Sequence, residues 1–374
     1  MLTTIITTVV LLQGAAAAAP TVEDAMRLAA QGDFAAAERH LTAFVARNPR
    51  DADAHYRLGV VRMRQNKLPE AAAALTAAIR IDAAPPAFHL ALAETYLRQP
   101  DRARAIASAA EAARRAGDNA ALWRAIAALQ ARAADGLGEA RSLQECLRLK
   151  PDDRAAHIRL ATLLLDHRTA DGAVAVATAA LARFPADAEV WRLRGLAEYA
   201  MGNKTDAVRS FLAAIDAAPE DAIGYASLET LLPDAEAVTP ATIPEIVRRL
   251  RPFAARNPVG HYLLALAVPA GAEAETHLRE AAVGAPDFWP AHYQLGRLLQ
   301  ARGDRDAAIA EFQAVLRLNR SHAESHYALA QLVPARDQAR LHREEHHRLR
   351  QEAARAEQAR AAAKPRIQVA LSPP

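Results

Sequence analysis

A repeat of about 34 residues constrains this chain more than any other feature of its sequence. A Leu-Gly pair, or a pair resembling it, recurs in segments with helical apolar spacing. Six such pairs follow one another at exact intervals of one period: Leu58-Gly59, Leu92-Ala93, Ile126-Ala127, Leu160-Ala161, Arg194-Gly195 and Leu228-Glu229. Leu295-Gly296 follows just short of two periods later, and Leu329-Ala330 lies one full period beyond that. A fixed period of this length is typical of small units that stack on their neighbours.

Each period contains two segments with the pattern of a helix. Residues 188–201 and 206–217 illustrate the pair, and the turn Gly202-Asn203-Lys204-Thr205 separates them. Proline ends the second segment in several units, and an aspartate two residues later is placed to cap the next helix; Asn119 occupies the same phase in another unit. The expected caps are Asp51, Asn119, Asp153, Asp187 and Asp221.

Composition supports an almost wholly helical chain. Of the 374 residues, 52% are hydrophobic but only 5% are aromatic, and roughly a quarter are alanine. Alanine, leucine, arginine and glutamate favour helices, and so much alanine leaves each helix a narrow apolar stripe. The single Cys146 excludes an internal disulfide. We expect it to fill a helix contact, as Ala78, Ala180 and Ala214 do in the same phase of other units.

At this point the sequence resembles the tetratricopeptide repeat family, whose unit is a helix-turn-helix of about 34 residues. The unit that carries the resemblance best contains Trp191, Gly195, Gly202, Ala207, Phe211, Ala214 and Pro219. The resemblance covers about residues 22–345. It implies an all-α, right-handed superhelical solenoid of about ten repeats. These residues are packing residues, so the resemblance is specific for the fold and not for a biochemical role.

The expected domain organisation has three parts. Residues 1–19 form a signal peptide or N-terminal anchor, residues 20–345 form the solenoid, and residues 346–374 form a cationic solvated helix and a disordered tail. The solenoid is irregular at 231–286, where Pro233, Pro240 and Pro244 interrupt the pattern. We interpret this irregularity as a loop and kink inside one continuous solenoid, the alternative being a boundary between two blocks of repeats.

The N-terminal segment predicts export. Residues 2–19 carry no charge and run from Ile5-Ile6 and Val9-Val10 into five alanines. This pattern is typical of a secretory signal, with cleavage expected before Ala19. No lysine or arginine precedes the apolar run, so retention as an anchor and a cytoplasmic location stay open as alternatives. Together with arginine-rich, alanine-rich usage, the segment favours a periplasmic or cell-envelope protein of a bacterium.

The C-terminal region contains the strongest catalytic-looking motif. His342-Arg343-Glu344-Glu345-His346 matches the H-x-x-E-H string of one zinc-peptidase class. We interpret it as a charged helix face, because residues 336–363 have few large apolar residues and no cavity is implied there. Residues 335–374 hold nine basic and five acidic side chains, so this end is the cationic part of a chain whose net charge is +3.

A concave surface built by the first helix of each pair is the expected binding site. In the resembled family, peptides lie on this surface. The candidate residues stand at i, i+4 and i+7 spacing beside the packing positions, and the alternative for each is packing against the second helix. They are Tyr56, Leu90, Arg124, Ile158, Arg192, Tyr199, Tyr293, Arg297 and Tyr327. Tyrosine and arginine are the residue types enriched at binding hot spots.

The sequence therefore predicts a non-enzymatic interaction scaffold. Its partner would be a protein or peptide that combines apolar and acidic residues, because arginine pairs with carboxylates and tyrosine offers flat apolar area. We expect no catalytic residues, cofactor, metal site or nucleic-acid partner. Two alternatives remain: an accessory or regulatory subunit of an envelope enzyme or assembly machine, and a protein that binds anionic surfaces through its C-terminal helix.

Overall fold

A computed structural model of the chain describes residues 21–219, 222–229, 231–232 and 242–363. These residues form twenty α-helices and no strand, so the all-α prediction is confirmed. The segment 1–19, the cap Asp221, the prolines Pro233 and Pro240, and the tail after Ala363 lie outside the described residues. The chain divides into two compact units, residues 1–142 and 143–374, which we call unit 1 and unit 2.

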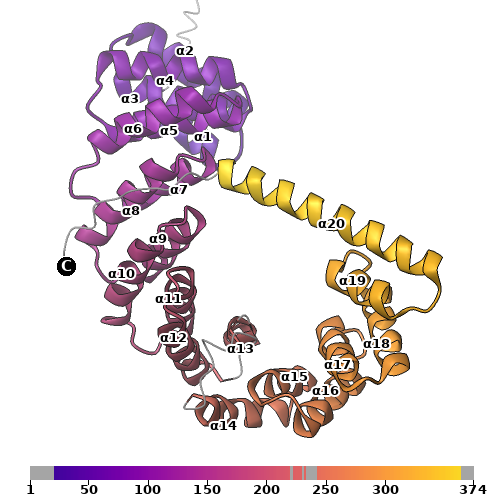
Figure 1. Cartoon of the computed structure of the whole chain (residues 1–374). Coiled ribbons are helices and arrows are strands. Elements are labelled where there is room, and N and C mark those ends of the chain that lie inside the picture. The colour runs from indigo at the N-terminus through magenta and orange to yellow at the C-terminus, as the bar shows by residue number, and fades with distance from the viewer. Residues whose placement is uncertain (1–20, 220–221, 230, 233–241, 364–374) are drawn as a thin grey trace, which may run out of the picture. The chain divides into compact units, whose positions relative to one another are not determined.

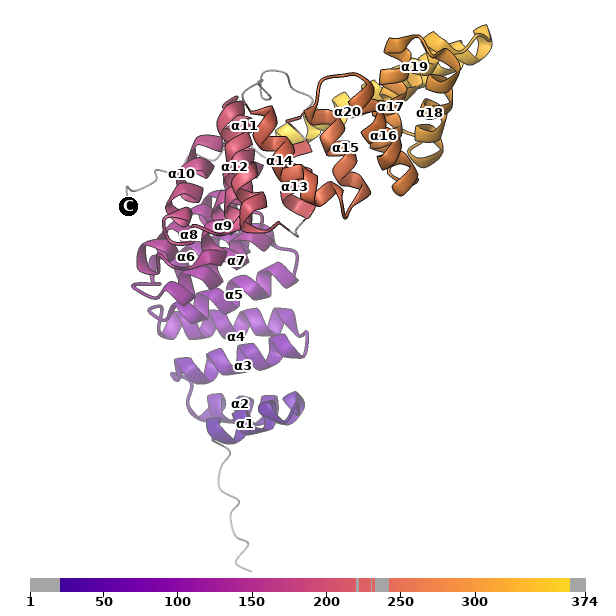
Figure 2. The same cartoon turned by 90° about the horizontal axis from the view of Figure 1, so that it is seen from below.

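Unit 1 is an ordered stack of antiparallel helix pairs (Figures 1 and 2). Each helix packs on its partner in the pair and on the next helix along the chain. The helices are α1 (Val22–Ala30), α2 (Phe34–Arg47), α3 (Ala52–Arg64), α4 (Leu68–Ile81), α5 (Pro86–Arg98), α6 (Arg102–Arg114) and α7 (Ala120–Arg132). The division between the units falls inside α8 (Gly136–Leu149).

Unit 2 continues the pairing to the C-terminal helix. Its helices are α9 (Arg154–Asp166), α10 (Ala170–Leu181), α11 (Ala188–Ala200), α12 (Lys204–Ala217), α13 (Ala222–Glu229), α14 (Ile243–Ala254), α15 (Pro258–Ala267), α16 (Ala272–Gly284), α17 (Trp289–Arg302), α18 (Arg305–Leu318), α19 (Ala323–Leu332) and α20 (Arg336–Ala363). α13 is the shortest of them, and it stands beside the predicted irregularity.

The helix caps and turns occur at the residues that the sequence pattern predicted. Asp51, Asn119, Asp153 and Asp187 each accept a hydrogen bond from a backbone N–H in the first turn of α3, α7, α9 and α11. At the turn between α11 and α12, Gly202 has a φ of +82°, a left-handed conformation that glycine adopts without strain. Each of these helices therefore begins or ends where local chemistry satisfies its backbone groups.

Close approach of the two helices in a pair depends on a small residue opposite a large one. In unit 2, a Cβ atom added to Gly195 would stand 2.5 Å from a ring carbon of Phe211, which is fully buried. In unit 1, Gly59 stands in the same way against the fully buried Leu75. Cys146 is also fully buried, in agreement with the expected packing role. The repeated pairs thus share one packing arrangement, and each unit is a helical solenoid.

A hydrogen bond that the repeat pattern did not predict ties many of the pairs to the one before. The fourth residue of the first helix has a polar-tipped ring, and its N–H or O–H donates to the carbonyl oxygen six residues earlier. The residues at this position are His55, His89, Trp123, His157, Trp191, Tyr225, His292 and His326, with distances of 2.8–3.3 Å. We call this interaction the ring–carbonyl bond.

Candidate functional site

Several first helices of successive pairs contact each other within a unit, and the first helices carry the predicted binding residues. α3 contacts α5 and α5 contacts α7 in unit 1, while α9 contacts α11 and α15 contacts α17 in unit 2. Residues one period apart therefore recur along one face of the first helices. We call this face the first-helix surface.

In unit 1, two of the three predicted binding residues pack against other side chains of the solenoid. Tyr56 stacks on Phe88 with ring centroids 4.8 Å apart, and burial raises the pKa of its hydroxyl. Leu90 packs against the buried clusters around Ala93 and Ala112. Arg124 on α7 is exposed. Tyr56 and Leu90 thus contribute to the solenoid interior at least as much as to its surface.

In the first pairs of unit 2, the three predicted residues differ in accessibility. Ile158 packs against the cluster formed by Ala177, Ala180, Leu181 and Val190. Arg192 is half-buried and donates two hydrogen bonds to Glu189, at 2.9 and 2.6 Å. Tyr199 is exposed at the end of α11. The predicted row of Arg124, Ile158 and Arg192 spans both units, and it stays a prediction.

The C-terminal pairs of unit 2 hold an open part of the first-helix surface. The Arg297 guanidinium lies 5.9 Å from the Tyr293 ring centroid on α17, within the range of a cation–π contact. Burial raises the pKa of Tyr293, whose ring also stands edge-on to His322 at 4.6 Å. Tyr327 on α19 has 52% of its area exposed. An arginine over an aromatic ring on α17 and an exposed tyrosine on α19 therefore lie on two successive repeats, and the Tyr327 ring also lies 5.2 Å from the His346 ring on α20.

The H-x-x-E-H motif does not assemble a catalytic site among the described residues. His342 Nδ1 lies 2.9 Å from Nδ1 of His326 on α19, and His346 Nδ1 donates to the carbonyl oxygen of Ala323 at 2.9 Å. Glu345 is bound by Arg348.

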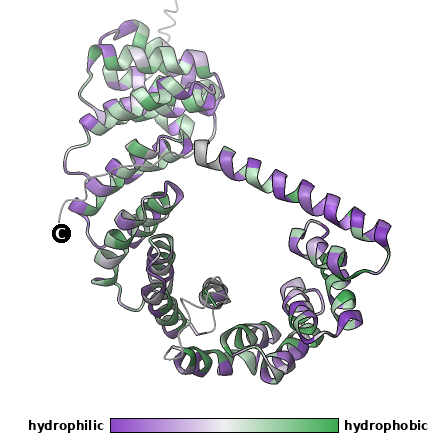
Figure 3. Cartoon of the chain, viewed as in Figure 1, coloured by the Kyte–Doolittle hydropathy of each residue, from purple (hydrophilic) through white to green (hydrophobic). Residues whose placement is uncertain are grey.

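The prediction of a solvated face needs correction at His342 and His346. Both histidines are half-buried, because α20 packs on α19 along this part of its length. Residues 350–359 of α20 are exposed, and the helix is largely hydrophilic (Figure 3). The solvated part of α20 therefore begins after the motif.

Two shallow hollows lie at turns between helices. One, of about 550 Å³, lies in unit 2 at the turn between α10 and α11, where Arg154 and Asp187 form an ion pair. The other, of about 640 Å³, lies in unit 1 between α4 and the turn from α5 to α6, beside Tyr96 and Arg104. Neither encloses a buried polar cavity of the kind that an enzyme site needs.

No helix in the described residues is both long and apolar enough to cross a bilayer. The N-terminal segment, on which the prediction of export depends, lies outside those residues.

A comparison with known families agrees with the architecture. A family model described as Tetratricopeptide repeat matches residues 22–87, 158–222 and 293–333. No curated protein matches the sequence. Among solved structures, YrrB, described as a TPR protein with an unusual peptide-binding site, is 18% identical; the match covers 50% of this chain and 97% of YrrB, with a TM-score of 0.41.

Two further solved structures match over more of the chain. The C-terminal part of a TPR repeat-containing protein from Cytophaga hutchinsonii is 14% identical, and the match covers 73% of this chain and 99% of that one, with a TM-score of 0.46. The TPR domain of P58(IPK) is 15% identical, with coverage of 89% and 98% and a TM-score of 0.29.

Proposed function

Because the chain is a tetratricopeptide repeat protein, we propose that it is a non-enzymatic scaffold that holds a protein or peptide partner on its first-helix surface. The observation that carries this proposal is the exposure of Arg297 on α17 and of Tyr327 on α19, with the Arg297 guanidinium over the half-buried Tyr293 ring. Repeats of this kind present extended surfaces, and tyrosine with arginine is the composition of binding hot spots.

The side chains of Tyr327 and Arg297 indicate which kind of partner segment would bind. Tyr327 offers a large ring whose ordering on binding costs little conformational entropy, and Arg297 pairs well with a carboxylate. A partner segment with an apolar anchor next to an acidic side chain would therefore match both. We place this interaction in the bacterial cell envelope, on the basis of the signal-like residues 2–19.

A site-specific crosslink tests the surface directly. A photoreactive amino acid placed at Tyr327 in the native host should give a discrete adduct with one partner. The same amino acid at Val283 is the matched control, because Val283 is 80% exposed but lies on α16, a second helix. Mass spectrometry of the adduct then identifies the partner and the N-terminus of the mature chain.

The outcomes separate the proposed surface from its alternatives. Adducts at Tyr327 but not at Val283, weakened by Arg297→Glu, support the proposal. Equal adducts at both positions would contradict it. Adducts that disappear on deletion of residues 350–374 while Arg297→Glu leaves them unchanged would favour an anionic partner bound through α20.

A further inference from the structure

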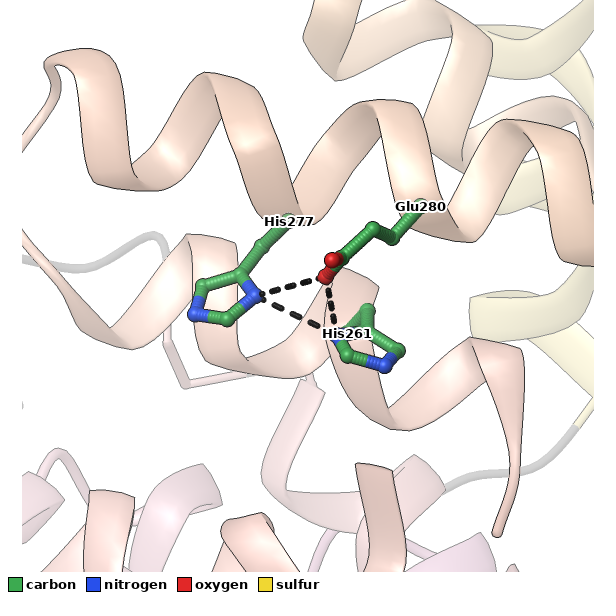
Figure 4. A group of neighbouring side chains, drawn as sticks. All are labelled: His261, His277 and Glu280. Atoms are coloured by element: carbon green, nitrogen blue, oxygen red, sulfur yellow. Dashed lines mark hydrogen bonds and ion pairs between the residues drawn. The ribbon is translucent and has the colours of Figure 1, made fainter. Parts of the chain in front are cut away.

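Two histidines and a glutamate meet between α15 and α16 (Figure 4). His261 extends from α15, and His277 and Glu280 extend from neighbouring turns of α16. His261 Nδ1 lies 3.2 Å from His277 Nδ1 and 2.8 Å from Glu280 Oε2, and His277 Nδ1 lies 3.3 Å from the same oxygen. Three potential ligand atoms therefore form one small triangle.

The triangle has nearly the size that one metal ion requires. Zinc bonds imidazole nitrogen at about 2.1 Å and carboxylate oxygen at a similar length, so two ligands of a tetrahedral ion stand about 3.4 Å apart. All three observed distances are slightly shorter than this value, so a small opening of the side chains is enough. The ion would replace the proton that joins the two Nδ1 atoms.

The surroundings leave a position for a fourth ligand. The side chains of His261 and His277 are 26% and 22% exposed, and that of Glu280 is 49% exposed. The cluster is thus half-buried between the helices and open to water on the side of Glu280. No arginine or lysine forms an ion pair with Glu280 in the part of the chain that the structure describes.

The two following repeats show which features are special to this cluster. In the next pair, His292 Nδ1 lies 2.7 Å from Glu311, but Ala308 stands where α16 has His277. In the last pair, His326 and His342 face each other at 2.9 Å, but Arg348 binds Glu345. Most second helices have alanine at this position: Ala37, Ala71, Ala105, Ala173, Ala207 and Ala308. Of these three pairs, α15–α16 is the one in which two histidines lie beside a glutamate that no arginine binds within the described residues.

We propose that His261, His277 and Glu280 bind a divalent transition-metal ion of the zinc class, with water as the fourth ligand. Two imidazoles and one carboxylate suit zinc, copper and nickel better than magnesium or calcium. The ion would join α15 to α16 within the segment 231–286, where the repeat pattern is irregular. This inference departs from the expectation of no metal site and is independent of the proposed partner surface.

Titration of the full-length chain with Zn²⁺ tests the site. Wild type should bind Zn²⁺ at this site, and Co²⁺ in its place should give the intense visible absorption of tetrahedral coordination. His277→Ala should weaken the binding by on the order of tenfold or more, since changing even an outer partner of a metal ligand costs that much. This variant supplies the alanine that neighbouring repeats carry, so it should keep its helicity.

Two further variants keep the result decisive. Glu280→Gln preserves the shape of a half-exposed side chain but removes its charge, and it should also weaken binding on the order of tenfold. His342→Ala is the matched control, because it removes the equivalent histidine of the last repeat; it should leave Zn²⁺ affinity and the Co²⁺ spectrum unchanged. Wild-type affinity in both His277→Ala and Glu280→Gln, or loss of binding in His342→Ala alone, would overturn the proposal. If His277→Ala fails to fold, Glu280→Gln decides.

Discussion

In one pair of unit 1 the glycine of the first helix faces a leucine, whereas in two pairs of unit 2 the equivalent glycine faces a phenylalanine. Leu75 covers Gly59, while Phe211 covers Gly195 and Phe312 covers Gly296. One continuous apolar cluster of unit 2 runs from Ala207 to Ala339 and includes both phenylalanines. These three pairs therefore have the same glycine contact, made with a flexible aliphatic side chain in unit 1 and with a rigid ring in unit 2.

The difference implies different tolerance to change. A leucine can rotate to relieve a clash or fill a gap, but a buried ring has few alternative positions. Unit 1 also contains a polar network around Glu38 on α2. Glu38 accepts hydrogen bonds from Arg62 on α3, from Gln65 at the C-terminal end of α3, and from Lys67. We expect unit 2 to lose more free energy of unfolding than unit 1 when equivalent positions are altered.

Truncation of the large residue should give the largest effect. Phe312→Ala should lower the free energy of unfolding of unit 2 by about 3–5 kcal/mol, because it leaves a cavity the size of a ring. Leu75→Ala, at the equivalent position of unit 1, should cost about 2–4 kcal/mol. Hydrogen exchange read by mass spectrometry measures the two units separately. A larger loss for Leu75→Ala would contradict the comparison.

Enlargement of the small residue should come next. Gly195→Leu forces a side chain against the Phe211 ring, and we expect a loss of about 1–3 kcal/mol in denaturant unfolding. Gly59→Leu should cost less, since the two nearest atoms belong to the flexible Leu75 side chain at 2.6 and 2.8 Å, while the Ala71 carbonyl oxygen lies farther away at 3.2 Å. Equal losses in the two variants would show that ring rigidity does not matter.

A third pair of variants compares buried polar contacts. Ser210 donates to the buried Glu198 at 2.6 Å in unit 2, and Ser142 donates to the buried Gln130 at 2.7 Å in unit 1. Ser210→Ala should cost about 1–3 kcal/mol because it removes a donor from a carboxylate, and Ser142→Ala about 1 kcal/mol. Thermal unfolding of both variants checks the order, and reversal would contradict it.

Acid should produce the smallest difference. Burial opposes the charge of Glu38, but hydrogen bonds from Lys67, Arg62 and Gln65 outweigh burial and lower its pKa. Hydrogen bonds from Arg248 and Arg249 lower the pKa of the exposed Glu245 to about 2. A lowered folded pKa stabilises the fold above the unfolded value of 4.5, and this contribution is lost as the pH falls toward the folded pKa.

Thermal unfolding between about pH 6 and pH 2 measures this acid effect. Glu38→Gln should flatten the pH dependence of unit 1. Glu245→Gln should flatten that of unit 2 less, because water and salt screen its ion pairs. A stronger effect of Glu245→Gln would mean that the exposed pairs matter more than the half-buried network.

The repeat period was sufficient to predict where the helices lie. It was not sufficient to predict which of their side chains are exposed. The predicted helical segments 188–201 and 206–217 agree with α11 and α12 to within two residues at each end, since caps, prolines and apolar spacing act locally. Exposure of the binding residues was harder to predict. Ile158 and Tyr56 have the right spacing for the first-helix surface, but contacts with neighbouring helices cover much of both.

The histidine cluster and the ring–carbonyl bond were missed for the same reason. Each joins residues from different elements, and their roles emerge only when the repeats are aligned position by position. The signals were present: a ring with a polar tip once in most periods, and histidine at 277 and 342 where most repeats have alanine. A comparison of the residues at each repeat position across all repeats would have identified both the ring–carbonyl bond and the histidine cluster.

The ring–carbonyl bond also has a mechanical meaning. It joins the end of one pair to the start of the next, so it resists hinging at each junction where it occurs. At α15 the equivalent ring, His261, forms no ring–carbonyl bond among the described residues, and its Nδ1 lies beside His277 and Glu280. When unit 2 is stretched, we expect the junction between α14 and α15 to open first, because it lacks this hydrogen bond.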